Sequence, residues 1–281
     1  MTTDLFATAA TLIQEADGLL VTAGAGMGID SGLPDFRGAQ GFWKAYPGLA
    51  KSRMHFQDIA CPDAFRDTPE LAWGFYGHRL ALYRATLPHR GFEILRNIGE
   101  RMANGSFVFT SNVDGQFQKA GFTAEKVQEC HGSIHLLQCM QPCNPCLWDA
   151  AFDPVIDEVH CRMISRLPVC PECGATARPN IMMFHDWNWH DQRARVQAKR
   201  FTEWRARVNN PVIIELGAGT HIPSVRLFSE SQARFGKLVR INPNESGKPS
   251  WAKGVSIPTG ALEAMDAIND SLYEAGFWEG A

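Results

Sequence analysis

Residues 18–38 have the sequence GLLVTAGAGMGIDSGLPDFRG, an apolar run followed by a glycine-rich stretch. The run at residues 18–23 is typical of a short buried strand. Five glycines follow within the fifteen positions 24–38. Glycine costs backbone entropy, so glycines clustered after a strand indicate positive φ angles or a ligand that contacts the main chain. Two interpretations stay open: a loop whose backbone N–H groups bind phosphate at a helix start, and a tight structural turn.

The glycine pattern differs from the common dinucleotide fingerprint in two ways. In GAGMG, residues 24–28, the third glycine comes one position early. No acidic residue stands at a strand end about 20 residues further on, where a carboxylate would bind a ribose. These differences disfavour a hydride-transfer dehydrogenase. They leave the segment PDFRG, residues 34–38, to be explained.

This strand and loop belong to a pattern that recurs along the chain. Helices are predicted at 3–15, 92–102 and 261–275, and strands at 18–23, 107–110, 211–216, 237–241 and 254–257. Strands that alternate with helices favour an α/β fold with a parallel sheet covered on both faces. Ligands of such sheets bind outside the carboxyl ends of the strands. We therefore expect the loops after these strands, among them residues 111–115 and 217–220, to meet at one edge.

Composition disfavours several classes of protein. The 281 residues are 45% hydrophobic and 20% charged, which is typical of a globular protein. The formal net charge of −3 lacks the basic excess that phosphate-backbone binding needs, so no nucleic acid partner is expected. No run approaches the roughly 18 apolar residues that span a bilayer. Residues 1–13 have no cationic residue ahead of their apolar stretch, so we expect no membrane partner and a cytoplasmic location.

Two stretches do not follow the alternation. Residues 41–89 are helical in pattern and rich in aromatic residues, which predicts a packed core stripe, with a ligand cage as the alternative. The stripe consists of Trp73, Phe75, Tyr76, Leu80 and Tyr83. Residues 139–186 carry cysteines and several prolines, so they are predicted to form a loop-rich insert.

Four cysteines of this insert form two close pairs. Cys139 and Cys143 are separated from Cys170 and Cys173 by 26 residues. Two such pairs can bring four thiolates around one tetrahedral Zn²⁺, and four sulfur ligands leave no position for water, so a structural zinc is predicted. Cys146 forms C-x2-C with Cys143 and is an alternative ligand. The other cysteines are predicted to be plain buried thiols: Cys61, Cys130 and Cys161.

Four motifs in order carry a resemblance to a known family. They are GAG at 24–26 with SGLPDFRG at 31–38, TSNVDG at 110–115, HGS at 131–133, and the cysteine pairs. These resemble the cofactor loop, second NAD motif, catalytic-base motif and zinc module of the sirtuins, NAD-dependent protein deacylases, of the bacterial type. The resemblance spans roughly residues 18–260. It implies that NAD is consumed as a co-substrate: nicotinamide is cleaved off, and the acyl group of a modified lysine moves to ADP-ribose.

The resemblance also implies roles for single residues. His131 is the implied general base, because an imidazole accepts a hydroxyl proton near neutral pH, and Asn112 and Asp114 complete the catalytic set. Phe36 would shield the reactive ribose face from water. The implied cofactor-binding residues are Gly24, Ala25, Gly26, Asp35, Phe36, Arg37, Ser111, Asn112, Val113, Asp114, His131, Gly217, Gly219, Thr220, Asn242 and Ala261. The resemblance favours Cys139 over Cys146 as a zinc ligand, and His135 is predicted to be scaffold.

Several positions depart from the family pattern. HDWNWH at 185–190 replaces the usual Gly-Glu, and it is predicted either to reshape the acyl-peptide clamp or to form an exposed loop. GAGT at 217–220 stands where Gly-Thr-Ser is more usual. MG at 27–28 replaces an aliphatic-hydroxyl pair, and QF at 116–117 replaces Leu-His. None of these changes removes the implied base or the Asn-Asp pair.

We therefore predict a Rossmann-like NAD-binding domain formed by residues 1–40, 90–135 and 191–281. A helical module at 41–89 and a zinc-binding module at 136–190 are expected to form a second, smaller domain. The predicted function is NAD-dependent removal of acyl groups from lysines of a protein or peptide substrate. Two alternatives stay open: an ADP-ribosyltransferase or NAD glycohydrolase, and a non-catalytic module that senses NAD.

Overall fold

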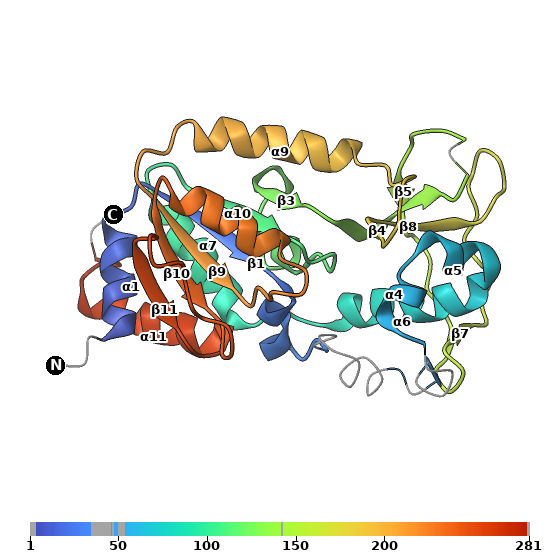
Figure 1. Ribbon diagram of the computed structural model, residues 1–281, viewed down its shortest axis with the longest axis horizontal. Helices are drawn as coiled ribbons and strands as arrows, with labels where there is room; N and C mark the ends of the chain where they lie inside the picture. The colour runs from blue at the N-terminus through green and yellow to red at the C-terminus, as the bar shows by residue number, and fades with distance from the viewer. Residues whose placement is uncertain (1–3, 35–45, 47, 50–53, 142, 280–281) are drawn as a thin grey trace.

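A six-stranded parallel sheet forms the centre of the larger lobe in the computed structural model, which describes residues 4–34, 46, 48, 49, 54–141 and 143–279 (Figure 1). Its strand order is β11-β10-β9-β1-β2-β3. The strands are β1 (Gly18–Ala23), β2 (Ser106–Thr110), β3 (Val127–Glu129), β9 (Pro211–Leu216), β10 (Lys237–Ile241) and β11 (Gly254–Ile257). Every adjacent pair is parallel. The expected sheet is confirmed, and four of its strands have the predicted bounds.

Helices cover both faces of this sheet because successive strand residues point to opposite sides. Leu19 and Val21 of β1 join a core with α1 (Leu5–Gln14), α7 (Arg90–Arg101) and α11 (Ala261–Glu274). Leu20 between them faces a second core, formed with α9 (Gln192–Arg205) and α10 (Ser224–Ala233). All six residues of β1 are buried. The short elements here are η1 (Ala25–Ser31), α8 (Gln116–Lys119) and η2 (Ala124–Lys126).

A smaller lobe packs around its own core. Its helices are α4 (Phe56–Ile59), α5 (Pro62–Asp67) and α6 (Pro69–Ala85). Its strands are β4 (Gly132–Cys139), β5 (Trp148–Asp149) and β8 (Ala177–Ile181), in the order β5-β4-β8, with a hairpin of β6 (Ile156–Asp157) and β7 (Arg162–Met163). Figure 1 shows α9 running along the top of the molecule between this lobe and the larger one.

Helix α6 supplies the aromatic stripe that the sequence predicted, and all five residues of the stripe lie in the core of the smaller lobe. The helix approaches the β6–β7 hairpin closely at Gly74. A Cβ atom added there would lie 2.0 Å from the carbonyl oxygen of Cys161, so only glycine fits.

The two lobes have separate cores, while the residue limits of the two expected domains stay a prediction. Among the described residues, no helix is both long enough and apolar enough to cross a membrane.

Candidate active site

The loops that follow β1, β2, β9 and β10 meet at the carboxyl edge of the sheet, as the sequence predicted. Asn112 Nδ2 donates a 3.0 Å hydrogen bond to the carbonyl oxygen of Gly24. The backbone N–H of Gly26 donates to the carbonyl oxygen of Gly217 at 3.0 Å. Asn242 Nδ2 donates to the carbonyl oxygen of Ala218 at 3.0 Å. A chain of hydrogen bonds therefore links the four loops before any ligand is bound.

The glycines of the first loop are needed because the protein's own backbone comes close to them. A Cβ atom on Gly24 would lie 2.8 Å from Cα of Ala218. Gly217 has a φ of 58°, and a Cβ atom there would lie 2.4 Å from Cα of Gly26. The two loops thus form a cradle that side chains would fill. The tight-turn interpretation is correct for this contact, and phosphate binding by residues 24–26 stays a prediction.

Asp114 lies in a buried corner after β2. Its Oδ1 accepts a 2.9 Å hydrogen bond from the backbone N–H of Gln116, and its carbonyl oxygen lies 2.9 Å from His135 Nε2. His135 therefore holds the backbone of this corner, in agreement with its predicted scaffold role. Burial raises the pKa of the Asp114 carboxyl to about 6, because the charged form loses hydration there. Ser111 and Val113 lie in the same corner, where Val113 is buried and its carbonyl oxygen accepts from the N–H of Ile134.

His131 lies between β3 and β4, at the junction of the two lobes. Gly132, with a φ of 84°, makes the sharp turn after it, and a Cβ atom on Gly132 would lie 2.0 Å from the carbonyl oxygen of Asn180. The carbonyl oxygen of His131 accepts a 2.9 Å hydrogen bond from the N–H of Met182. Its Nε2 atom lies 3.2 Å from Ser224 Oγ. Burial lowers the pKa of the imidazole, so the ring is neutral at pH 7 and can accept a proton.

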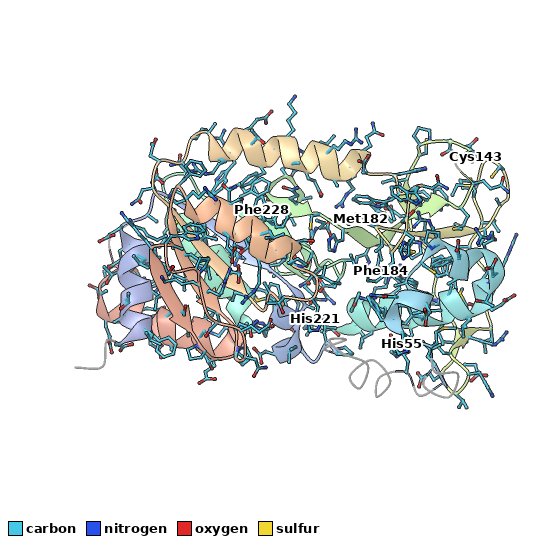
Figure 2. All side chains as sticks on the ribbon, in the orientation of Figure 1. His55, Cys143, Met182, Phe184, His221 and Phe228 are labelled. Carbon is cyan, nitrogen blue, oxygen red and sulfur yellow. The ribbon has the colours of Figure 1, made fainter. Side chains whose placement is uncertain are left out.

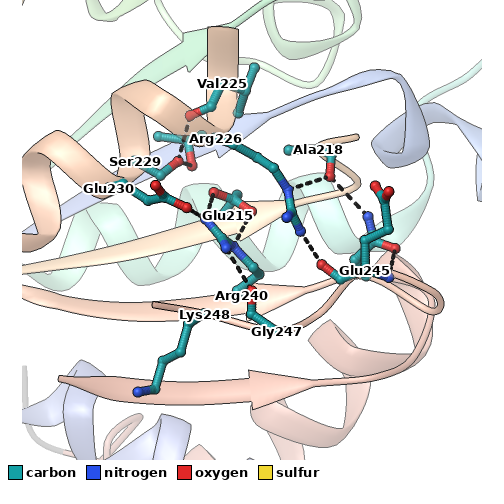
Figure 3. A network of polar contacts seen from close by, with 12 residues as sticks. Glu215, Ala218, Val225, Arg226, Ser229, Glu230, Arg240, Glu245, Gly247 and Lys248 are labelled. Atoms are coloured by element: carbon teal, nitrogen blue, oxygen red, sulfur yellow. Dashed lines mark hydrogen bonds and ion pairs between the residues drawn. The ribbon is translucent and has the colours of Figure 1, made fainter. Parts of the chain in front are cut away.

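The loop after β9 is tied to the loop after β10 by a residue that sequence analysis missed, Glu245. The Glu245 carboxylate accepts hydrogen bonds from the N–H of Thr220 at 3.1 Å and from Thr220 Oγ1 at 2.7 Å. Arg226 reaches the carbonyl oxygens of Ala218 and Glu245 (Figure 3). Asn242 is buried and accepts from the N–H of Glu245 at 2.9 Å, so its amide holds this loop. The only feature of the sequence that could have identified Glu245 is that it is an acidic residue three positions after Asn242.

The remaining predicted cofactor residues fall into two groups. Asp35, Phe36 and Arg37 lie outside the described residues. Ala261 is buried at the start of α11, where Asp30 Oδ2 accepts a 2.8 Å hydrogen bond from the N–H of Leu262. An intrachain carboxylate thus occupies the first turn of α11.

The four predicted zinc ligands come together at the end of β4. Their Sγ atoms all lie within 4.8 Å of one another. The Sγ atoms of Cys139 and Cys173 are 3.6 Å apart, as are those of Cys143 and Cys170. Tetrahedral zinc with Zn–S bonds of about 2.3 Å places its sulfur ligands about 3.8 Å apart, so the cluster fits zinc. Cys146 is exposed and is not part of this group.

A buried ion pair anchors the segment at residues 185–190 to the smaller lobe. Arg178 and Asp186 form an ion pair at 2.8 Å whose side chains are 1% and 0% exposed. Asp186 also accepts hydrogen bonds from the N–H groups of Met183 and Asn188. Trp187 at the tip is 93% exposed. The tip of the loop is exposed, as one interpretation expected, and a role in the acyl-peptide clamp stays a prediction. Met182 and Phe184 precede the loop where the chain leaves β8 (Figure 2).

Together these features define a nucleotide-binding α/β protein that carries a second lobe, in which four clustered cysteines can hold a metal ion. The chain belongs to the Sir2 family, whose family model matches residues 24–203.

Relatives and solved structures of this family cover most of the chain. It is 31% identical to an NAD-dependent protein deacylase of Deinococcus radiodurans, over 82% of this chain and 85% of that protein. It is 30% identical to an NAD-dependent protein deacylase of Thermococcus kodakarensis, over 85% of each chain. A Sir2 homologue in complex with ADP-ribose superposes with a TM-score of 0.72 at 25% identity, covering 97% of this chain and 98% of the other. A Sir2 homologue in complex with NAD gives the same TM-score at 24% identity, covering 95% and 93%.

Proposed function

We propose that the protein is an NAD-dependent protein lysine deacylase. The observation that supports this most directly is the placement of the half-buried imidazole of His131, which lies at the lobe junction beside the first turn of α10. Neutral imidazole is the form that removes a proton from a hydroxyl group. Membership of the Sir2 family, whose relatives above are named NAD-dependent protein deacylases, supports the same activity.

In this proposal NAD is a substrate. The bond between its ribose and nicotinamide breaks, and nicotinamide is the leaving group. Gly24 and Gly217 let the loops after β1 and β9 pack against each other, and in the proposal the phosphates of NAD bind along these loops. Asn112 and Asp114 orient the nicotinamide half of the cofactor, a role that the proposal also assigns to Asp35, Phe36 and Arg37. His131 takes a proton from a hydroxyl group of the ribose, which makes that oxygen a nucleophile toward the transferred acyl group.

The zinc ion has a structural role in the proposal. Cys139, Cys143, Cys170 and Cys173 would hold it through four sulfur ligands, a set that would leave no position for water or substrate. Its chemistry there is to cross-link the end of β4 to the turn before β8. The fold of the smaller lobe then depends on the metal.

The substrate in this proposal is an acyl-lysine of a protein or peptide, without a nucleic acid or membrane partner. A cytoplasmic location is part of the proposal.

The test is nicotinamide release from NAD, measured with and without a panel of acyl-lysine peptides. The proposal predicts that release depends on an acyl-lysine peptide and that acylated ADP-ribose appears in equal amount. Release that is indifferent to every peptide would support the NAD glycohydrolase or ADP-ribosyltransferase alternative. Bound NAD without any turnover, unchanged in His131→Ala, would support the sensing module.

A further inference from the structure

Helix α10 brings a hydroxyl group to the imidazole of His131. Ser224 is the first residue of this helix, and its Oγ lies 3.2 Å from His131 Nε2. Other serines of α10 hydrogen-bond back to their own helix: Ser229 Oγ to the carbonyl oxygen of Val225 at 2.8 Å, and Ser231 Oγ to that of Phe228 at 2.6 Å. Within the part of the chain that the structure describes, Ser224 Oγ has His131 as its one hydrogen-bonding partner. The Ser224 hydroxyl group therefore hydrogen-bonds to the His131 ring and not to the backbone of its own helix.

The helix that carries Ser224 is held firmly on the sheet. Ser229 Oγ lies 2.8 Å from Thr22 Oγ1 of β1, and both residues are buried. Glu230 forms an ion pair at 2.9 Å with the buried guanidinium of Arg240, which also pairs with Glu215 at 2.6 Å (Figure 3). These contacts fix the body of α10 against β1, β9 and β10. The position of Ser224 is thus set by the fold and not by a flexible loop.

Contacts on the other side of α10 extend this support toward His131. Phe228, labelled in Figure 2, stacks on Phe109 of β2 with 3.7 Å between ring centroids. Val225 is buried in the same cluster, and Cys130, the neighbour of His131 in the chain, packs against it. Arg226 ties the first turn of α10 to the carbonyl oxygen of Ala218 in the loop after β9. One rigid helix therefore contacts the predicted base and the loop predicted to bind the cofactor.

A neutral imidazole has one N–H group and one lone pair, and the hydrogen bond at one nitrogen decides which nitrogen keeps the proton. We propose that Ser224 is the positioning residue of His131: its oxygen accepts the Nε2–H group, so that Nδ1 keeps the lone pair and takes the ribose hydroxyl proton. This inference rests on the proposed function, because it assigns the base of that reaction. In the proton transfer the O–H bond of the ribose breaks and an N–H bond forms at Nδ1. The Nε2–H group stays bonded to Ser224.

The tautomer of His131 can be measured without substrate. Nitrogen-15 NMR of the cofactor-free protein, above the pKa of the ring, separates an Nε2–H from an Nδ1–H imidazole. We expect Nε2–H in the wild type and in Ser224→Thr, which keeps the hydroxyl group, and a mixture in Ser224→Ala. A wild-type ring with its proton on Nδ1 would overturn the proposal. So would an unchanged tautomer in Ser224→Ala.

Kinetics give an independent test. Ser224→Ala is expected to lower kcat for deacylation by about 10- to 100-fold, because the base loses its orientation, while KM for NAD changes little. Ser224→Thr should restore most of kcat. Ser231→Ala, at an exposed serine of the same helix, is the matched control with wild-type kcat. Equal kcat in Ser224→Ala and wild type would overturn the inference and leave the deacylase function intact, whereas a wild type without deacylation would refute the function and leave the tautomer measurement valid.

Discussion

Asn112 Nδ2 donates a 3.0 Å hydrogen bond to the carbonyl oxygen of Gly24, across the ends of the neighbouring parallel strands β1 and β2. This hydrogen bond is one of three connected hydrogen bonds at the ends of the two strands. Thr110 Oγ1 donates to the carbonyl oxygen of Ala23 at 2.9 Å and accepts from the N–H of Asn112 at 3.0 Å. Intrachain hydrogen bonds therefore hold the corner that contains Asn112, and a site held in this way loses less conformational entropy on binding.

Asn112→Asp should separate these two loops. The change replaces an N–H donor by a carboxylate oxygen that faces the Gly24 carbonyl, so a hydrogen bond becomes a repulsion. We expect the affinity for NAD to fall more than tenfold and the free energy of unfolding to fall by about 1 to 3 kcal/mol. Calorimetric titration with NAD and urea unfolding measure the two effects. Gln57→Glu adds the same charge at an exposed position and should change neither. Wild-type NAD affinity in Asn112→Asp would contradict the assigned role.

Asp114 is expected to make the stability of the protein depend on pH. Burial raises its pKa from 3.8 to about 6, so the folded protein holds the proton more tightly than the unfolded chain does. The contribution of Asp114 to the free energy of unfolding should therefore fall as pH rises from about 4 to about 6, and stay lower above that range. At pH 7.5 the buried charge costs about 2 to 3 kcal/mol.

The test variant is Asp114→Asn, which keeps the shape of the side chain without its charge. It should be more stable than the wild type at pH 7.5 and similar to it at pH 4, in urea unfolding at both values, while deacylation is lost. Asp270→Asn, which removes an exposed carboxylate, serves as the control. The same stability difference at both pH values would show that the charge of Asp114 is not the cause.

The zinc content of two variants distinguishes the clustered set of four cysteine ligands from a set that includes Cys146. Cys170→Ser removes one of the four clustered thiols, so we expect less than 0.1 zinc per chain and an unfolded smaller lobe, because such sites contribute about 10 to 16 kcal/mol of apparent binding energy. Cys146→Ser should keep about one zinc per chain and wild-type circular dichroism. Elemental analysis of the purified variants measures both. Loss of zinc from Cys146→Ser would instead place that thiol among the ligands.

The sheet could be predicted from the sequence, because its strands are short apolar runs that end in glycine or polar loops. β3, α9 and α10 were not predicted. β3 has only three residues, and α9 is rich in arginine, with Phe201 and Trp204 as its large buried side chains. β3 pairs with β2, α9 packs against β3, and α10 packs against β9, β10 and β1, contacts that no local pattern shows.

The predicted site was incomplete for a similar reason. Motifs identify residues that stand together in the chain, such as Asn112 and Asp114. Ser224 and Glu245 lie outside every motif, and their contacts with His131 and Thr220 join loops that lie 93 and 25 residues apart in the chain. The buried Arg178–Asp186 ion pair was also missed, since a charged residue in a polar stretch gives no sign of burial. Sequence thus indicated the chemistry, and the fold supplied the positioning groups.

Gly217 offers the sharpest test of the loop cradle. Its φ of 58° is strained for other residues, and a Cβ atom there would lie 2.4 Å from Cα of Gly26. Gly217→Ala should therefore push the loops after β1 and β9 apart, lower the free energy of unfolding by about 2 to 4 kcal/mol and abolish NAD binding. Gly247→Ala is the matched control, because a Cβ atom there meets no atom within 4 Å, and its stability should stay within about 0.5 kcal/mol of the wild type. Urea unfolding and NAD titration of both variants decide the matter: a Gly217→Ala protein that binds NAD as the wild type does would mean that the contact between these loops is not what shapes the cofactor site.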